Sequence, residues 1–154
     1  MTKASWRNCN RFLTRRQCNC TPFRNKEGFC WNNVLNPLAR LLKVKMKSAS
    51  VNDVGSMSLS SLLPSVPNYY IVTLLNGNLL FDYYREYLNC TVNIQINDIR
   101  QIPLIVPNKE ELKRIHHLFQ QAYSIKRDNP SECSKELSDI ESLMDKYINS
   151  LYHI

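Results

Sequence analysis

The hydrophobic pattern of this chain begins with alternation of period two. Between positions 42 and 47 apolar residues alternate with lysines: Leu42, Val44 and Met46 against Lys43, Lys45 and Lys47. Successive side chains of a strand point to opposite faces. The alternation therefore predicts a strand that ends at residue 47, with a core face and a lysine face. Residues 56–63 predict another strand.

A second alternating stretch occupies residues 91–107. Its apolar positions are Val92, Ile94 and Ile96, and its amides are Asn93, Gln95 and Asn97. We expect an extended strand here, followed by a buried strand or extended connector over 102–106. Exposed amides are suited to reading the hydrogen-bonding edges of bases. The alternative is that a turn or a β-layer satisfies them internally.

Helical spacing dominates the rest of the chain. Residues 68–76 and 79–88 predict two short helices, the second capped by Asn78. Asn108 and Glu111 form a capping box before a longer helix. Asn129 and Pro130 predict the start of a last helix that ends near residue 151. The fold class is then α+β: a small mixed β-sheet with short helices, followed by two C-terminal helices. We expect three parts: a basic, cysteine-rich segment (1–25), a recognition-like domain (26–107) and a helical pair (108–154).

The charge of the chain is unevenly distributed. The net charge is +7, but residues 1–50 hold eleven Lys or Arg and one acid, Glu27, whereas the remainder has nine basic and twelve acidic residues. This asymmetry indicates a surface for a polyanion, with a solvated basic tail as the equally open alternative. Lysines two residues apart on a strand are separated by about 6.6 Å. That spacing is close to the phosphate spacing of DNA, although lysines on a strand edge also prevent aggregation.

Motifs for catalysis or cofactor binding are weak. Cys9, Cys18, Cys20 and Cys30 could hold zinc, but they lack paired Cys-x2-Cys knuckles, so unligated thiols are the alternative. Glycine occurs only at 28, 55 and 77, so no phosphate-binding loop is present. We therefore expect no cofactor and no catalysis by this chain alone. Without a signal peptide pattern or a membrane span, the expected location is the cytoplasm.

Several sequence blocks carry a family resemblance. They are 26–31 (KEGFCW), 51–54 (VNDV), 56–58 (SMS), 67–72 (PNYYIV) with Leu75 and Asn76, and 91–103 (TVNIQINDIRQIP). In this order the blocks resemble the TaqI-like C-terminal specificity domain of adenine-specific DNA methyltransferases and fused restriction–modification enzymes. The chain is also similar to the recognition domains of type I specificity subunits. The resemblance covers roughly residues 26–151, and 91–107 is its most specific part.

The resemblance implies DNA recognition without catalysis. Such domains place loops and strand edges in the major groove, while a separate domain transfers the methyl group. That separate domain needs a glycine-rich S-adenosylmethionine loop and an Asn/Asp-Pro-Pro-Tyr/Phe motif. Here the Asn-Pro pairs at 36–37 and 129–130 continue as Leu38 and Ser131. The family also implies that 91–107 is scaffold, which leaves base reading to the basic region before residue 66.

We therefore predict the target-recognition part of a bacterial restriction–modification methyltransferase, without its catalytic domain. The expected partners are double-stranded DNA and a separate methyltransferase or restriction subunit, with no membrane. The candidate phosphate contacts are Arg40, Lys43, Lys45, Lys47 and Arg100. Asn93 and Gln95 are expected to help position the recognition surface. The alternative is a protein-interaction module that docks a partner subunit through its C-terminal helices. A third hypothesis is a zinc-stabilised nucleic-acid-binding protein built on residues 9–30.

Overall fold

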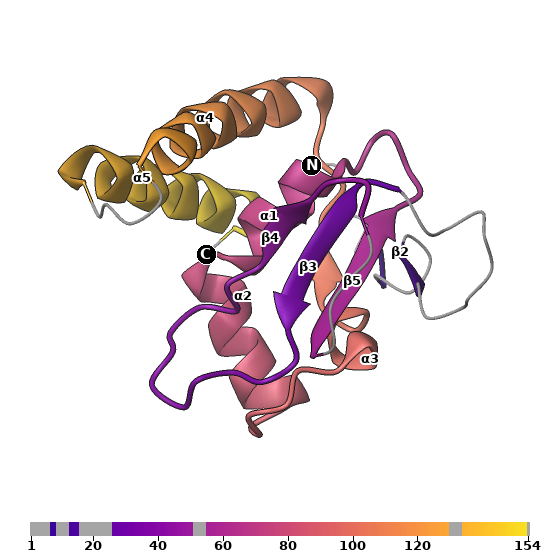
Figure 1. The fold of residues 1–154 in the computed structure, drawn as a ribbon. Helices are drawn as coiled ribbons and strands as arrows, with labels where there is room; N and C mark the ends of the chain where they lie inside the picture. The colour runs from indigo at the N-terminus through magenta and orange to yellow at the C-terminus, as the bar shows by residue number, and fades with distance from the viewer. Residues whose placement is uncertain (1–6, 9–12, 16–25, 51–54, 130–133, 154) are drawn as a thin grey trace. The chain divides into compact units, whose positions relative to one another are not determined.

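A computed structural model describes residues 7–8, 13–15, 26–50, 55–129 and 134–153 (Figure 1). The chain divides into two compact units, Met1–Val106 and Pro107–Ile154. The division falls after Val106, whereas the sequence analysis places a boundary after residue 107.

The first unit is built on an antiparallel sheet (Figure 1). Its strands lie in the order β2 (Leu13–Arg15), β5 (Ser56–Ser61), β3 (Gly28–Asn32) and β4 (Lys45–Lys47). A separate two-stranded ladder joins β1 (Arg7–Asn8) to β6 (Pro103–Leu104). The α+β class is confirmed, and so is the strand within 56–63. The sheet was expected to be mixed, but every strand pair in the described residues is antiparallel.

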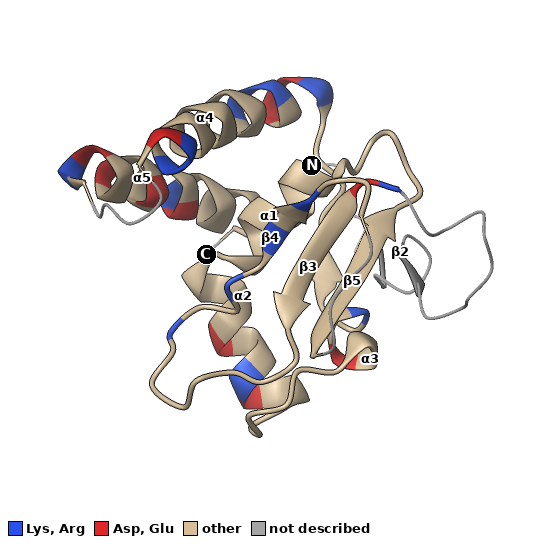
Figure 2. Ribbon diagram, in the orientation of Figure 1, with Lys and Arg blue, Asp and Glu red and all other residues tan. Residues whose placement is uncertain are grey.

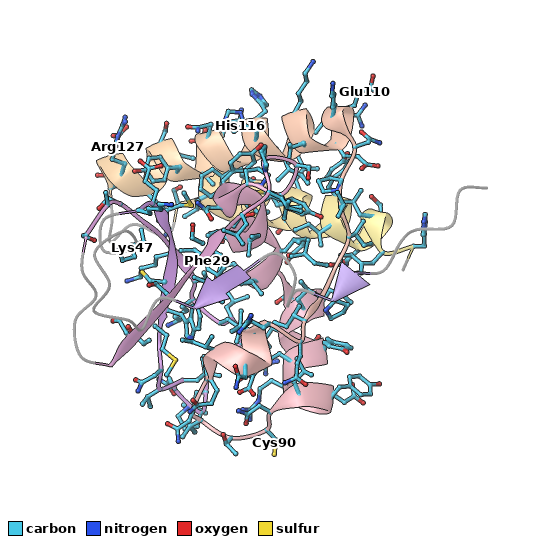
Figure 3. All side chains as sticks on the ribbon, turned by 90° about the vertical axis from the view of Figure 1, so that its right-hand side faces the viewer. Phe29, Lys47, Cys90, Glu110, His116 and Arg127 are labelled. Atoms are coloured by element: carbon cyan, nitrogen blue, oxygen red, sulfur yellow. The ribbon has the colours of Figure 1, made fainter. Side chains whose placement is uncertain are left out.

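The register gives the sheet one apolar face and one polar face. Phe29 lies opposite both Leu59 and Met46, and directly opposed residues share a face. Phe29 and Leu59 are fully buried, and Phe29 lies in the interior in Figure 3. Gly28 is also required by this packing, because a Cβ atom there would collide with the carbonyl oxygen of Leu59.

Two helical elements belong to this core. The first is α1 (Asn68–Leu75), which is buried from Tyr70 to Leu75. The second begins as α2 (Asn78–Tyr83) and continues as a π-helical turn, η3 (Tyr84–Leu88). Both predicted helices are confirmed. Asn78 is not the cap, however, because Gly77 occupies the N-cap position and Asn78 is already helical.

The segment 91–107 does not form the predicted scaffold strand. Asn93 makes an isolated antiparallel bridge with Val34, and α3 (Ile96–Ile99) follows directly. The Asp98 carboxylate accepts a hydrogen bond of 3.1 Å from the backbone N–H of Gln95, the N-cap residue, which stabilises this helical turn. Ile96 and Ile99 are spaced for one helix face, and both are buried. The connector after α3 contains β6, in keeping with the predicted extended segment over 102–106.

The second unit consists of α4 (Lys109–Asp128) and α5 (Lys135–Leu151). The capping box is confirmed: Asn108 Oδ1 accepts from the backbone N–H of Glu111 at 2.9 Å, and the Glu111 carboxylate accepts from Asn108 N–H at 2.7 Å. The predicted start of the last helix at Asn129 is wrong. Helix α5 begins at Lys135, and the hydroxyl of its N-cap residue, Ser134, accepts a hydrogen bond at 3.2 Å from Leu137 N–H.

Candidate nucleic-acid interface

The β3–β4 loop, residues 33–44, carries two of the predicted site residues and leads directly into a third. Its first end is held by backbone hydrogen bonds to the segment before α3. Leu35 N–H donates to Val92 O at 2.7 Å, and Ile94 N–H donates to Asn33 O at 2.8 Å. The indole N–H of Trp31, at the end of β3, also donates to Ile94 O at 3.4 Å. The loop therefore leaves the sheet from a fixed position.

The other end of the loop is held by a side chain that the sequence analysis missed. Asn76, the C-cap of α1, accepts from Val44 N–H at 2.8 Å and donates to Val44 O at 2.8 Å. Its amide thus pairs with Val44 as the backbone of a neighbouring strand would. In the sequence, Asn76 signals only a helix break. Nothing local indicates a partner 32 positions away.

Two buried leucines flank the middle of the loop, residues 36–41. Leu35 is 6% exposed and Leu42 is 2% exposed. Between them, Asn36 begins a turn in which its own carbonyl accepts from Ala39 N–H at 2.8 Å. The Asn36 side chain also accepts from Leu38 N–H at 2.9 Å. Local side-chain hydrogen bonds of this kind hold a turn in one conformation.

The loop and the following strand present exposed cations. Arg40, Lys43 and Lys45 are all exposed, and the sequence contains no acidic residue from 28 to 52. Figure 2 shows the basic positions along the β3–β4 loop and on β4, which is the edge strand of the sheet. Because no nearby carboxylate in this segment neutralises them, their positive potential extends into solvent.

The predicted three-lysine face is wrong in its details. Lys43 precedes the strand and has a positive φ of 53°, so it does not share the pleat of β4. Lys45 is exposed on the strand. Lys47 is only 8% exposed, and its ammonium donates to the carbonyls of Ser48 and Ser50. A lysine whose protons are taken by backbone carbonyls is a structural residue rather than a phosphate contact.

Cys30 lies opposite Lys45 on the polar face of the sheet. Burial raises the pKa of its thiol, and the nearby Lys47 and Lys45 partly offset that rise. The thiol is therefore protonated at neutral pH. The other three cysteines of the zinc hypothesis, Cys9, Cys18 and Cys20, lie outside the described residues. Within the described ranges, no cluster of three His, Cys, Asp or Glu side chains could hold a metal ion.

Asn89 and Asp98 organise the loop that displays the predicted amides. Asn89 Nδ2 donates to the Asp98 carboxylate at 2.7 Å and to Asn93 O at 2.9 Å. Asn89 Oδ1 accepts from Thr91 N–H at 2.8 Å. The Tyr84 hydroxyl also donates to Asp98, at 3.4 Å. Burial of Tyr84, and then the Asp98 charge, raise the pKa of this hydroxyl, so it remains a donor.

Asn93 and Gln95 are both exposed, and the bridge to Val34 places Asn93 at the foot of the β3–β4 loop. Arg100 lies apart from that loop in the sequence, at the C-cap of α3, and is half-buried. The structure thus places Arg40, Lys43 and Lys45 on one continuous segment with Asn93 at its base. Lys47 is buried and does not belong to this exposed group.

The second unit has a different kind of surface. An open groove of about 540 Å³ lies between α4 and α5, lined by Leu118, Gln121, Lys135, Glu136, Asp139, Ile140 and Leu143. Figure 3 shows Glu110, His116 and Arg127 projecting outward from α4. The groove is both apolar and charged, which suits a protein surface better than a small ligand.

No protein-family model and no curated protein matches this sequence. In the described parts of the chain, no helix is long and apolar enough to cross a membrane.

Proposed function

We propose that this chain is a sequence-specific DNA-binding protein, the target-recognition part of a bacterial restriction–modification methyltransferase. In this proposal the chain performs no catalysis itself, and a separate methyltransferase or restriction subunit supplies it. The observation that carries the proposal is the β3–β4 loop: a segment anchored at both ends, with exposed cations and no acidic residue from 28 to 52. Such a segment meets a polyanion with little loss of conformational entropy.

Each residue of this segment has a role in the proposal. Arg40 contacts a phosphate through its planar guanidinium, which binds two oxygens at once. Lys43 and Lys45 act as point charges toward neighbouring phosphates. Phosphate contacts set the position of the protein on the duplex but do not read its sequence.

Sequence reading is assigned to exposed polar side chains beside these cations. Asn93 lies at the foot of the loop, and Gln95 follows it just before α3. An amide can pair with the N6 and N7 edge of adenine through one donor and one acceptor. The resemblance to target-recognition domains, carried by sequence blocks on β3, β5, α1 and residues 91–103, supports DNA recognition by this chain. It implies base reading by the region before residue 66, so the base-reading role of Asn93 and Gln95 rests on their exposure beside the β3–β4 loop.

The experiment is a selection from a library of randomised duplexes, performed with the whole chain. It is repeated with an adenine-specific methyltransferase subunit that lacks a recognition domain. We expect one short sequence to be enriched, and the Asn93→Ala variant to lose preference at one position of it. If neither selection enriches any sequence, target recognition is excluded.

The alternative function is a protein-interaction module, and the groove between α4 and α5 is the observation that favours it. Its apolar lining includes Leu118, Ile140 and Leu143, of which Leu143 is 53% exposed. A partner subunit held there would remain bound at moderate salt, because apolar burial is insensitive to screening. Co-purification across a salt series, with Leu143→Glu as the disrupting variant, tests this function separately from DNA binding.

A further inference from the structure

Leu38 has the largest exposed fraction of any large hydrophobic side chain in the described residues. It is 89% exposed, against 55% for Leu62, an exposed leucine of the same unit outside the loop. Scattered exposed leucines are ordinary on protein surfaces. Leu38 is unusual because it lies in the middle of the β3–β4 loop, two residues before the exposed Arg40.

The turn that carries Leu38 is held in one conformation. Pro37 fixes its own φ, and the Asn36 side chain accepts a hydrogen bond from Leu38 N–H at 2.9 Å. The Asn36 carbonyl accepts a second from Ala39 N–H, at 2.8 Å. Buried Leu35 and Leu42 fix the two flanks of the turn. The apolar tip is thus presented before any partner binds, so binding costs little ordering of the loop.

The surroundings of Leu38 define the chemistry of its partner. The exposed cations Arg40 and Lys43 follow it, and Val34, which is 58% exposed, precedes it. The matching partner has an apolar slot between negative charges. Stacked base pairs between two phosphate chains have this arrangement, and DNA-binding proteins insert apolar wedges between base steps.

A lipid surface fits these observations less well. It too would offer negative charges beside an apolar layer. However, a single myristoyl chain gives only marginal membrane binding, and a leucine side chain buries far fewer carbon atoms. A base step needs only one wedge of this size.

We infer that Leu38 is an apolar wedge that enters a base step of bound duplex DNA while Arg40 and Lys43 hold the adjacent phosphates. The inference rests on the proposed DNA binding and adds to it that the bound duplex is locally unstacked and bent. Part of the sequence preference then comes from how easily a step unstacks, in addition to base contacts.

The test uses the whole chain and a short mixed-sequence duplex in which 2-aminopurine replaces adenine at one position after another. Insertion unstacks the probe, so its fluorescence should rise at one step on binding. For Leu38→Ala we expect that rise to be lost and the dissociation constant to increase about tenfold. Leu38→Met should keep both properties, and the matched control Leu62→Ala should behave as the unchanged protein.

The outcomes distinguish the wedge from the proposed function. DNA binding without any rise in fluorescence overturns the wedge and leaves DNA binding standing. A Leu38→Ala variant that still unstacks the duplex also overturns it. Absence of duplex binding by the unchanged protein overturns both proposals. If Leu38→Ala instead abolishes binding to vesicles of anionic phospholipid, and no duplex binding occurs, the tip is a lipid contact.

Discussion

Individual residues decide which lysines of the candidate interface are free to meet a ligand. Lys45 and Lys47 are two positions apart on one short strand, and the alternating pattern predicts that both are exposed. In the folded chain Lys45 is exposed, whereas Lys47 donates to the carbonyls of Ser48 and Ser50. That difference arises from the backbone after β4, which an alternating pattern does not encode.

The two lysines provide a matched comparison. Lys45→Met should weaken duplex binding several-fold, because it removes one phosphate contact. Lys47→Met should leave the affinity for DNA unchanged and should lower the free energy of unfolding, because two carbonyls lose their donor. Fluorescence anisotropy and urea denaturation on both variants give the two quantities. Equal losses of affinity would contradict the assignment of Lys47 as structural.

Asn76 is the second decisive residue, because it closes the β3–β4 loop. Replacing it with alanine leaves the N–H and C=O of Val44 without their side-chain partner. We expect a loss of about 1–3 kcal/mol in the free energy of unfolding, measured by urea denaturation. The control is Asn97→Ala, an exposed amide on α3, which should change it by less than about 0.5 kcal/mol. Equal stability of the two variants would show that Asn76 does not hold the loop.

At the scale of elements, local patterns predicted most of the fold. The strand β5, the helices α1, α2 and α4, and the Asn108 capping box follow from spacing and capping residues that lie close together in the sequence. The failure at 91–107 has a specific cause. Its isoleucines at 94 and 96 fit a strand, whereas those at 96 and 99 fit a helix. The hydrogen bonds of Asp98 decide between them.

This Asp98 network predicts a response to alkaline pH. The pKa of the Tyr84 hydroxyl is raised above the ordinary value of 10.0, mainly by burial and then by Asp98. Above pH 10 the unfolded chain loses this proton while the folded chain keeps it, so the unfolded state gains stability. The free energy of unfolding should therefore fall as pH rises beyond about 10.

Two tyrosine variants isolate this effect in urea denaturation measured between neutral and alkaline pH. Tyr84→Phe should flatten the alkaline fall. Tyr87→Phe, at a position that is 67% exposed, should keep it. If the free energy of unfolding falls equally at alkaline pH in Tyr84→Phe, groups other than Tyr84 cause the fall.

At the scale of the whole molecule, the central claim is that the exposed cations lie on a segment that hydrogen bonds hold at both ends, the β3–β4 loop and the start of β4. The sequence indicated the charge, because the basic residues concentrate in its first third. It could not indicate the anchoring, since the contacts of Asn33 with Ile94 and of Val44 with Asn76 join positions far apart in the chain. The sequence therefore predicted a basic segment, but it predicted neither the anchoring of that segment nor the burial of Lys47.

The measurement that tests this claim most directly is the salt dependence of duplex binding by two charge-matched triple variants. One replaces Arg40, Lys43 and Lys45 with glutamine. The other replaces the exposed Lys109, Lys113 and Lys146 of the helical unit, so both lose the same charge. Three lost phosphate contacts should make the plot of log affinity against log salt concentration shallower by about two to three for the first variant. The second variant should keep the slope of the unchanged protein. Equal slopes for the two variants would contradict the β3–β4 loop as the DNA-binding surface.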